Sequence, residues 1–258
     1  MDTKGYAVGE VIFDGENHKV VWLGWDTDDS GGAVQTNQYL IIHGSDGFLL
    51  DPGGVHLFSR VVSVISRYID LDRIREILFS HQDPDVSSGI ALWLGITEAT
   101  IRLSSLWLRF VPHFGLVQLS RITEVPDRGE ALSLGGEGEI RMIPAHFLHS
   151  PGNFSYYDTI SGILFSGDIG AAVFPTGSEY LYVEDFDKHL GYMEGFHRRY
   201  MASNKVCANW VKRVRAERIN MIAPQHGAIF PENQVNRFLD WFSDLQCGSD
   251  IIETINES

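Results

Sequence analysis

The sequence has only two cysteines, Cys207 and Cys247, among its 258 residues. So few thiols exclude a disulfide-stapled fold and a thiolate-bound metal cluster. The two cysteines are far apart in the chain and outside any CxxC spacing. Because free cysteine is usually buried, we predict two inert thiols. They are compatible with a reducing compartment such as the cytoplasm.

Long apolar runs and basic charge are also scarce. No apolar run approaches the roughly 20 residues that cross a bilayer, and the N-terminus, Met1-Asp2-Thr3-Lys4, has no basic-then-apolar signal segment. Acidic residues outnumber basic ones by 34 to 20, which gives a formal net charge of −14. Such a surface repels phosphate backbones and anionic lipid. We therefore expect a cytoplasmic protein that binds neither nucleic acid nor membranes.

Two further motifs are missing. The sequence has no GxxxxGK phosphate loop, and no repeat of 20–50 residues. Its only glycine-rich patch, Gly135–Glu139, is short enough for a hairpin turn. The hydrophobic fraction of 44% and the charged fraction of 21% are those of an ordinary globular protein. We predict a single domain over residues 1–258.

The sequence does contain a regular succession of apolar segments. Short apolar runs bounded by turn signals predict strands, and apolar positions at helical spacing predict helices. The expected strands are 11–13, 20–23, 39–42, 48–50, 77–79, 140–143, 163–165 and 219–222. The expected helices lie over residues 55–65, 90–94 and 235–242, and a short polar tail, 251–258, follows them. Hairpins followed by alternating strands and helices indicate an α/β layered domain.

The segment His81-Gln82-Asp83-Pro84-Asp85 carries most of the chemical information. It follows an apolar strand and places an imidazole and two carboxylates at alternate positions, which a tightly turned backbone can project to one side. Burial of three such groups is costly unless a cation neutralises the carboxylates. A metal site is one interpretation. The alternative is an acidic surface loop that caps the next helix through Asp85, Ser87 or Ser88.

The same pattern recurs at three more strands. His149 follows the strand expected at 140–143, Asp168 follows 163–165, and His226 follows 219–222. Strand ends along one sheet edge are where α/β proteins assemble binding sites. Four sets of ligand-type residues, each just past a strand, therefore favour the metal interpretation over four unrelated structural residues.

These residues resemble the metallo-β-lactamase superfamily, whose leading motif is commonly HxHxDH. They are more similar still to its diiron branch, the flavodiiron proteins with HxExDH. The resemblance runs from Tyr39-Leu40-Ile41 to Ala223-Pro224-Gln225-His226-Gly227. It implies a metallo-β-lactamase-like αββα sandwich with two bound iron ions. It assigns one iron to His81, Asp83 and His149 and the other to Asp85 and His226, with Asp168 and an oxo, hydroxo or peroxo ligand bridging both.

Two positions depart from the flavodiiron motif. Asp83 replaces its glutamate, and Val86 replaces its final histidine. Zinc hydrolases of the superfamily usually have histidine at the position of Asp83, and a carboxylate there favours iron or manganese over zinc. Val86 cannot coordinate a metal. We therefore expect an open position on the second iron, where O2, NO or peroxide could bind, and weaker retention of that iron.

Other polar residues receive supporting roles. By resemblance, Asp51 is a structural carboxylate that hydrogen-bonds a ligand histidine or a loop amide. His146 is a weaker candidate ligand than His149. The remaining histidines of interest are expected to be structural or surface residues; they are His56, His113, His189 and His197.

The resemblance also suggests a function. The sequence has no room for a C-terminal flavodoxin domain of roughly 150 residues, so we expect no FMN in this chain. Stand-alone domains of this kind resemble oxygen-binding diiron proteins that act as sensors in bacterial chemotaxis. We expect a non-haem diiron protein that binds O2 or NO and reports it, or iron itself, to a signalling partner.

Two enzymatic alternatives stay open. One is an oxidoreductase that reduces O2 or NO with electrons from a separate flavoprotein. The other is a dinuclear metallohydrolase, in which a bridging hydroxide attacks an ester, thioester, lactam or phosphodiester. The carboxylate of Asp83 argues against the hydrolase. The oligomeric state is open as well, and a homodimer is among its alternatives.

Overall fold

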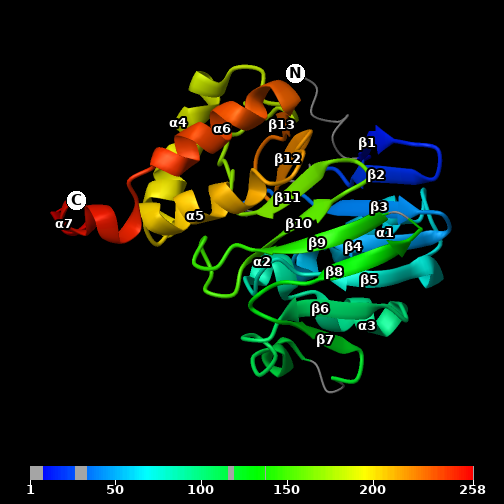
Figure 1. The fold of residues 1–258 in the computed structure, drawn as a ribbon. Coiled ribbons are helices and arrows are strands. Elements are labelled where there is room, and N and C mark those ends of the chain that lie inside the picture. The colour runs from blue at the N-terminus through cyan, green and yellow to red at the C-terminus, as the bar shows by residue number, and fades with distance from the viewer. Residues whose placement is uncertain (1–7, 27–33, 116–118, 137, 258) are drawn as a thin grey trace. The chain divides into compact units, whose positions relative to one another are not determined.

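A computed structural model describes residues 8–26, 34–115, 119–136 and 138–257. The chain divides into two compact units, unit 1 (Met1–Asp127) and unit 2 (Arg128–Ser258). Each unit contains one β-sheet and its own helices (Figure 1). The predicted mixed α/β class is therefore confirmed, with two sheets as the metallo-β-lactamase-like fold requires. The single domain over residues 1–258 stays a prediction.

The described residues of unit 1 form a seven-stranded sheet in the order β1-β2-β3-β4-β5-β6-β7. Neighbours from β1 to β4 are antiparallel, whereas those from β4 to β7 are parallel. The strands are β1 (Glu10–Asp14), β2 (His18–Trp22), β3 (Tyr39–His43), β4 (Asp46–Leu50), β5 (Ile74–Leu78), β6 (Thr100–Ser104) and β7 (Ile122–Val125). The helices are η2 (Val55–Leu57), α1 (Phe58–Ile65), η3 (Leu71–Arg73), α2 (Pro84–Ser87), α3 (Ile90–Ile96) and η4 (Val111–Phe114).

The core of unit 1 forms between its sheet and its helices. Helix α1 buries Val61, Val64 and Ile65, which share one face because their spacing is three and four residues. This face packs in one apolar cluster with Trp93 of α3 and Ile77 of β5. Parallel strands need a crossover connection, and α1 supplies it between β4 and β5. After this crossover β5 pairs with β4, and the segment that contains His81 follows the end of β5.

The described residues of unit 2 form a six-stranded sheet in the order β13-β12-β11-β10-β9-β8. The pair β11 and β12 is parallel and the other pairs are antiparallel. The strands are β8 (Ala131–Gly135), β9 (Gly138–Pro144), β10 (Phe154–Asp158), β11 (Ile163–Gly167), β12 (Met221–Pro224) and β13 (Phe230–Pro231). The helices are α4 (Phe186–Tyr200), α5 (Asn204–Val214), α6 (Glu232–Asp244), η5 (Gly248–Ile251) and α7 (Ile252–Glu257).

An aromatic core holds unit 2 together. Helices α4, α5 and α6 gather beside strands β12 and β13 (Figure 1). The rings of Phe238 and Phe242 stack with centroids 5.6 Å apart, and Phe230 lies 4.7 Å from Phe238. Every residue of β10 and β11 is buried. The strand that carries Asp168 at its end is therefore buried along its whole length.

Most of the predicted strands and helices are confirmed, with ends that move by up to three residues, but the C-terminal tail is not. Residues 251–257, predicted to be a polar tail, belong to η5 and α7. The reason is a contact that sequence periodicity does not show. The Asp250 carboxylate accepts hydrogen bonds from the backbone N–H groups of Asn204 at 2.5 Å and Cys247 at 3.2 Å. It fastens this segment to the start of α5.

The two thiols are buried as predicted, yet they are not separated in space. Cys207 Sγ lies 3.7 Å from Cys247 Sγ, and both side chains are fully buried. Helix α5 carries Cys207, whereas Cys247 precedes η5. Their distance along the chain gave no indication of this pairing. Their chemical inertness stays a prediction.

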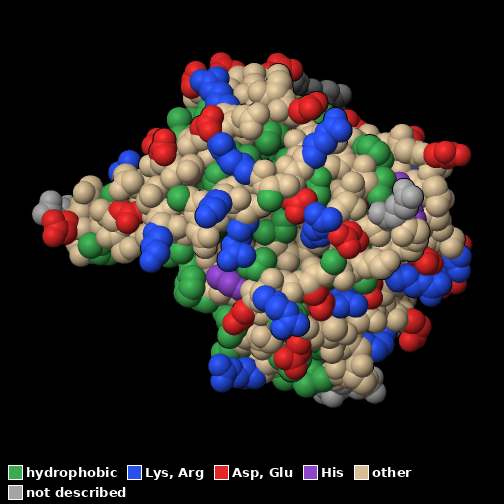
Figure 2. Space-filling view, in the orientation of Figure 1, with side chains coloured by type: hydrophobic (Ala, Val, Ile, Leu, Met, Phe, Trp, Pro, Cys, Tyr) green, Lys and Arg blue, Asp and Glu red, His purple; other side chains and the backbone are tan. Residues whose placement is uncertain are grey.

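Charged side chains of both signs lie on the described surface. On the face drawn in Figure 2, acidic and basic side chains are interspersed. Several pairs are in contact, among them Arg237 with Asp187 at 2.5 Å and Arg141 with Glu217 at 2.7 Å. Among the described residues, no helix has the length and apolar character required to traverse a bilayer.

Candidate metal centre

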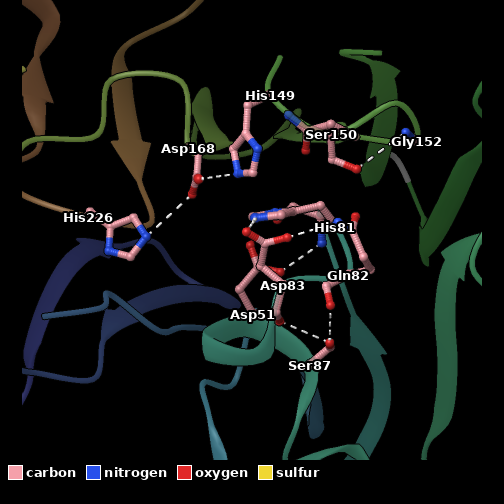
Figure 3. A network of polar contacts seen from close by, with 12 residues as sticks. Asp51, His81, Gln82, Asp83, Ser87, His149, Ser150, Gly152, Asp168 and His226 are labelled. Atoms are coloured by element: carbon pink, nitrogen blue, oxygen red, sulfur yellow. Dashed lines mark hydrogen bonds and ion pairs between the residues drawn. The ribbon is translucent and has the colours of Figure 1, made fainter. Parts of the chain in front are cut away.

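Three predicted ligands of unit 2 meet at one carboxylate. Asp168 directly follows β11, while His149 and His226 follow β9 and β12. Asp168 Oδ2 lies 2.9 Å from His149 Nε2, and Asp168 Oδ1 lies 3.5 Å from His226 Nε2 (Figure 3). The side chains of Asp168 and His226 are only 5% and 7% exposed. Each carboxylate oxygen thus faces its own imidazole nitrogen, an arrangement suited to a carboxylate that contacts two metal ions.

Glycine allows the backbone turns that carry these ligands. Gly167 and Gly227, which flank Asp168 and His226, have φ angles of 61° and 80°, in the left-handed region that favours glycine. A Cβ atom on Gly227 would lie 2.7 Å from Ala172 Cβ and 2.9 Å from Ala172 N. The loop with His226 therefore packs directly on the loop after Asp168, where Ala172 N donates to His226 O at 3.3 Å.

His197 fixes the loop after Asp168 from helix α4. Its Nδ1 donates to Met193 O at 2.8 Å, and the backbone N–H of Gly170 donates to its Nε2 at 2.9 Å. Only a neutral ring with the proton on Nδ1 makes both bonds. Burial lowers the pKa of His197 to about 4, although the bond to Met193 and the charge of Asp168 oppose the shift. The sequence predicted a structural or surface role, which is confirmed as structural, but not the positioning of this loop.

In unit 1, His81 and Asp83 lie close together. His81 Nε2 is 3.9 Å from Asp83 Oδ2 (Figure 3). The other ring nitrogen, Nδ1, is 2.9 Å from Ser80 Oγ, so Nε2 is the atom left facing the carboxylate. The Gln82 side chain donates to Asp83 Oδ1 at 2.8 Å and orients that carboxylate. His81 is almost wholly buried, whereas the Asp83 side chain is 31% exposed.

The start of helix α2 decides against the capping interpretation of this segment. The N-cap position is occupied by Asp83, not by Asp85, and the Asp83 side chain makes no capping hydrogen bond. Ser87 Oγ instead donates to Gln82 O at 2.8 Å and to Asp83 O at 3.0 Å. Asp85 is half-buried in the first helical turn. Val86 is fully buried and packs in the apolar core of unit 1.

Asp51 has the supporting role that the resemblance implied. Its Oδ1 accepts a hydrogen bond from the backbone N–H of Ser80 at 2.7 Å. Its own N–H donates to Leu78 O at 2.9 Å, at the end of β5. The buried carboxylate therefore ties the end of β4 to the residue that precedes His81, which confirms the predicted bond to a loop amide.

The other histidines named above are either packed against neighbouring rings or exposed at the surface. His189 is buried on α4, with Nδ1 2.8 Å from Tyr180 Oη, and burial lowers its pKa to about 4. His146 is half-buried and packs its ring edge-on against Phe154, with centroids 5.2 Å apart. His56 and His113 are exposed. The structural or surface roles predicted for His189, His56 and His113 are confirmed, whereas the weaker candidacy of His146 as a ligand stays a prediction.

Comparison with known proteins gives this geometry a family. A sequence profile described as "ODP family beta lactamase" matches residues 34–227. A solved structure described as the peroxy diiron species of chemotaxis sensor ODP is 57% identical to the chain; the match covers 96% of this chain and 99% of that one, with a TM-score of 0.87. The apo state of the chemotaxis sensor ODP from T. denticola is 56% identical, with 96% and 98% covered and a TM-score of 0.87.

More distant proteins share the fold. A flavoprotein from Thermotoga maritima is 21% identical over 91% of this chain and 60% of its own, with a TM-score of 0.75, and shows the fold alone. An uncharacterized protein of Methanocaldococcus jannaschii is 24% identical over 243 residues, or 87% of this chain. The chain spans 58% of the length of that curated relative. The motif match, the family profile and the two closely similar structures agree: this chain belongs to the ODP family of metallo-β-lactamase-like proteins, on the diiron branch of that fold.

Proposed function

We propose that this protein binds O2 at a pair of iron ions and acts as an oxygen sensor in chemotaxis-type signalling. The observation that carries the proposal is the buried Asp168 carboxylate, with an imidazole nitrogen beside each oxygen. Two similar structures, 57% and 56% identical over nearly their whole length, are described as a chemotaxis sensor, one of them in a peroxy diiron state. These two structures support iron as the bound metal and chemotaxis as the signalling process.

We assign the irons to six residues. His81, Asp83 and His149 would hold the first iron, Asp85 and His226 would hold the second, and Asp168 would contribute to both. The donor chemistry fits, because imidazole nitrogen and carboxylate oxygen without thiolate suit iron. Within each unit an imidazole Nε2 faces a carboxylate oxygen, at 3.9 Å in unit 1 and at 2.9 Å in unit 2. When bound, iron supplies the electrons that hold O2, which no side chain of this set can provide.

The chain's own residues prepare the ligands for this task. Ser80 Oγ holds Nδ1 of His81, which fixes the ring and leaves Nε2 for the metal. His197 holds Gly170 and thereby the loop that carries Asp168. Val86 lies in the core and would supply no ligand to the second iron, where the flavodiiron motif has its last histidine. We infer that a diatomic ligand would bind at this second iron.

The proposal is tested by measuring the iron content of the protein expressed with iron and then exposing its reduced form to O2. The protein expressed with iron should contain two iron ions per chain by elemental analysis, and the reduced form should give a long-lived coloured adduct with O2. Rapid multiple turnover with a separate flavoprotein would instead indicate a reductase. Zinc occupancy together with esterase activity would contradict the diiron assignment and favour a hydrolase.

Replacement of Asp168 tests the shared carboxylate. Asp168→Asn should lower the occupancy of both irons, because an amide is a poor replacement for a carboxylate that contacts two cations. His226→Asn should chiefly empty the second iron. Elemental analysis of the purified variants measures both effects, and the exposed Asp187→Asn serves as the control for the same chemical change. Normal iron content in Asp168→Asn would show that the bridging assignment is wrong.

A further inference from the structure

Unit 1 contains an apolar cavity of about 350 Å³ beside a predicted metal ligand. Its walls are made mainly by Phe79, Ile90, Leu103, Trp107, Phe110 and Val111, and His81 forms part of them. These residues come from the ends of β5 and β6, from α3 and from the segment that ends in η4. All of them belong to the same unit, so the cavity is a property of its fold.

The exposure of the lining residues changes from one part of the wall to another. His81, Phe79 and Val111 are at most 3% exposed. Phe110, in contrast, is 45% exposed, and His113 is also exposed. The cavity therefore joins the protein surface near Phe110 to the buried imidazole of His81.

Two polar side chains in the wall, those of Gln82 and Ser87, form hydrogen bonds within their own loop. Ser87 Oγ donates to Gln82 O and Asp83 O, and Gln82 Nε2 donates to Asp83 Oδ1. Apart from these two and the imidazoles of His81 and His113, the lining side chains are aromatic or aliphatic. Apolar cavities of this kind hold water poorly and take up nonpolar guests such as xenon or benzene. O2 is a small nonpolar molecule and should enter such a space more readily than water or an anion does.

We propose that this cavity admits O2 from solvent and concentrates it beside His81, as the entry chamber of the metal centre. The identity of the guest rests on the proposed function, whereas the affinity of the cavity for small nonpolar molecules does not. The proposal assigns Val111 to the buried part of the chamber and Phe110 to its mouth.

Xenon binding to the metal-free protein tests the cavity itself. Xenon should occupy the chamber in a xenon-pressurised crystal and broaden its resonance in solution NMR. Val111→Phe should weaken this binding, because the larger ring takes up part of the space. Val62→Phe makes the same change on α1, outside the cavity lining, and should leave xenon binding intact. Absence of xenon from the chamber of the unaltered protein would overturn the proposal.

Stopped-flow mixing of the reduced, iron-loaded protein with O2 tests the passage. Val111→Phe should slow O2 association several-fold, whereas Phe110→Ala should leave it unchanged or faster by widening the mouth, and neither should change the iron content. Phe110 is half-exposed, so its variant should fold even if the buried one does not. Identical association rates for Val111→Phe and the unaltered protein, or slower association in Phe110→Ala, would refute an entry route here.

A failure to bind iron would overturn the proposed function and the role of O2, and the xenon experiment would still decide on the cavity.

Discussion

At the scale of single residues, Asp51 has two structural roles: it adopts a left-handed backbone conformation and it accepts a buried hydrogen bond. Its φ angle is 44°, a left-handed conformation that Asp and Asn tolerate better than other residues with a side chain. Its carboxylate also accepts the hydrogen bond from the amide of Ser80. The residue before His81 is therefore held by a backbone turn and by a polar contact at the same time.

Two replacements of Asp51 should distinguish the backbone role from the hydrogen-bond role. Asp51→Asn keeps an acceptor oxygen and the tolerance for positive φ, so its effect on stability should be small. Asp51→Ala leaves the Ser80 amide unpaired in a buried place and should lower the free energy of unfolding by about 1–3 kcal/mol. Urea denaturation of both variants measures the difference. Equal stability of the two would show that the Ser80 contact does not hold this loop.

At the scale of elements, helix α4 carries two buried histidines on one face. His189 and His197 are eight residues apart, which returns to the same side of a helix. Desolvation lowers the pKa of each ring to about 4 from the ordinary value of 6.5. Both rings are therefore neutral in the folded protein, and Tyr180 and Gly170 contact them as neutral partners.

This arrangement makes stability depend on pH. Between pH 4 and 6.5 the unfolded chain binds more protons at these rings than the folded chain does, so the free energy of unfolding should fall as the pH is lowered through that range. Above pH 6.5 the two rings contribute no further change. The loss should reach about 3 kcal/mol for each ring at pH 4.

Urea unfolding at several pH values checks this dependence. His189→Phe should flatten the curve by removing one of the two contributions, whereas a change at the exposed His56, such as His56→Gln, should not. An unaltered slope in His189→Phe would show that this ring is not held neutral by burial.

The loops at the strand ends depend on glycine at defined positions. Gly227→Ala should destabilise the protein by about 1–3 kcal/mol and lower its iron content, because alanine is strained at a φ of 80° and its Cβ would overlap Ala172. Gly191→Ala is the matched control. It lies inside α4 with nothing within 4 Å of the new Cβ, and should stabilise the helix by up to about 1 kcal/mol. Thermal unfolding and elemental analysis of both variants measure these effects, and equal behaviour of the two would contradict the packing argument.

At the scale of the whole molecule, the sequence predicted the strands because apolar runs and turns are local signals. The ends of β5, β9, β11 and β12 could be placed in this way, and so could the residues that follow them. The contacts of His197 with Gly170 and of Asp250 with Asn204 join segments that local patterns treat separately. The sequence predicted only a structural or surface role for His197, and not which amide donates to it.

The same limit applies to the paired thiols and to the apolar cavity. Cys207 and Cys247 come together only because α5 and the segment before η5 are adjacent in the fold. The cavity beside His81 depends on the path of residues 105–114, for which the sequence gave no predicted element. Motif resemblance, in contrast, predicted a supporting carboxylate at Asp51 without any such information, with a ligand histidine or a loop amide as its partner, and the structure shows the amide of Ser80.

The parallel strand pairs have a consequence for the order of folding. In both units the ligand-bearing strands β5 and β12 pair with β4 and β11 only after a helical crossover, whereas β1–β4 and β8–β11 join neighbours along the chain. Since distant contacts form more slowly than local ones, amides of β9 and β10 should gain protection in pulsed hydrogen exchange before those of β12. Earlier protection of β12 would contradict this order. On this order, His226 reaches its place late, and metal uptake completes folding rather than starting it.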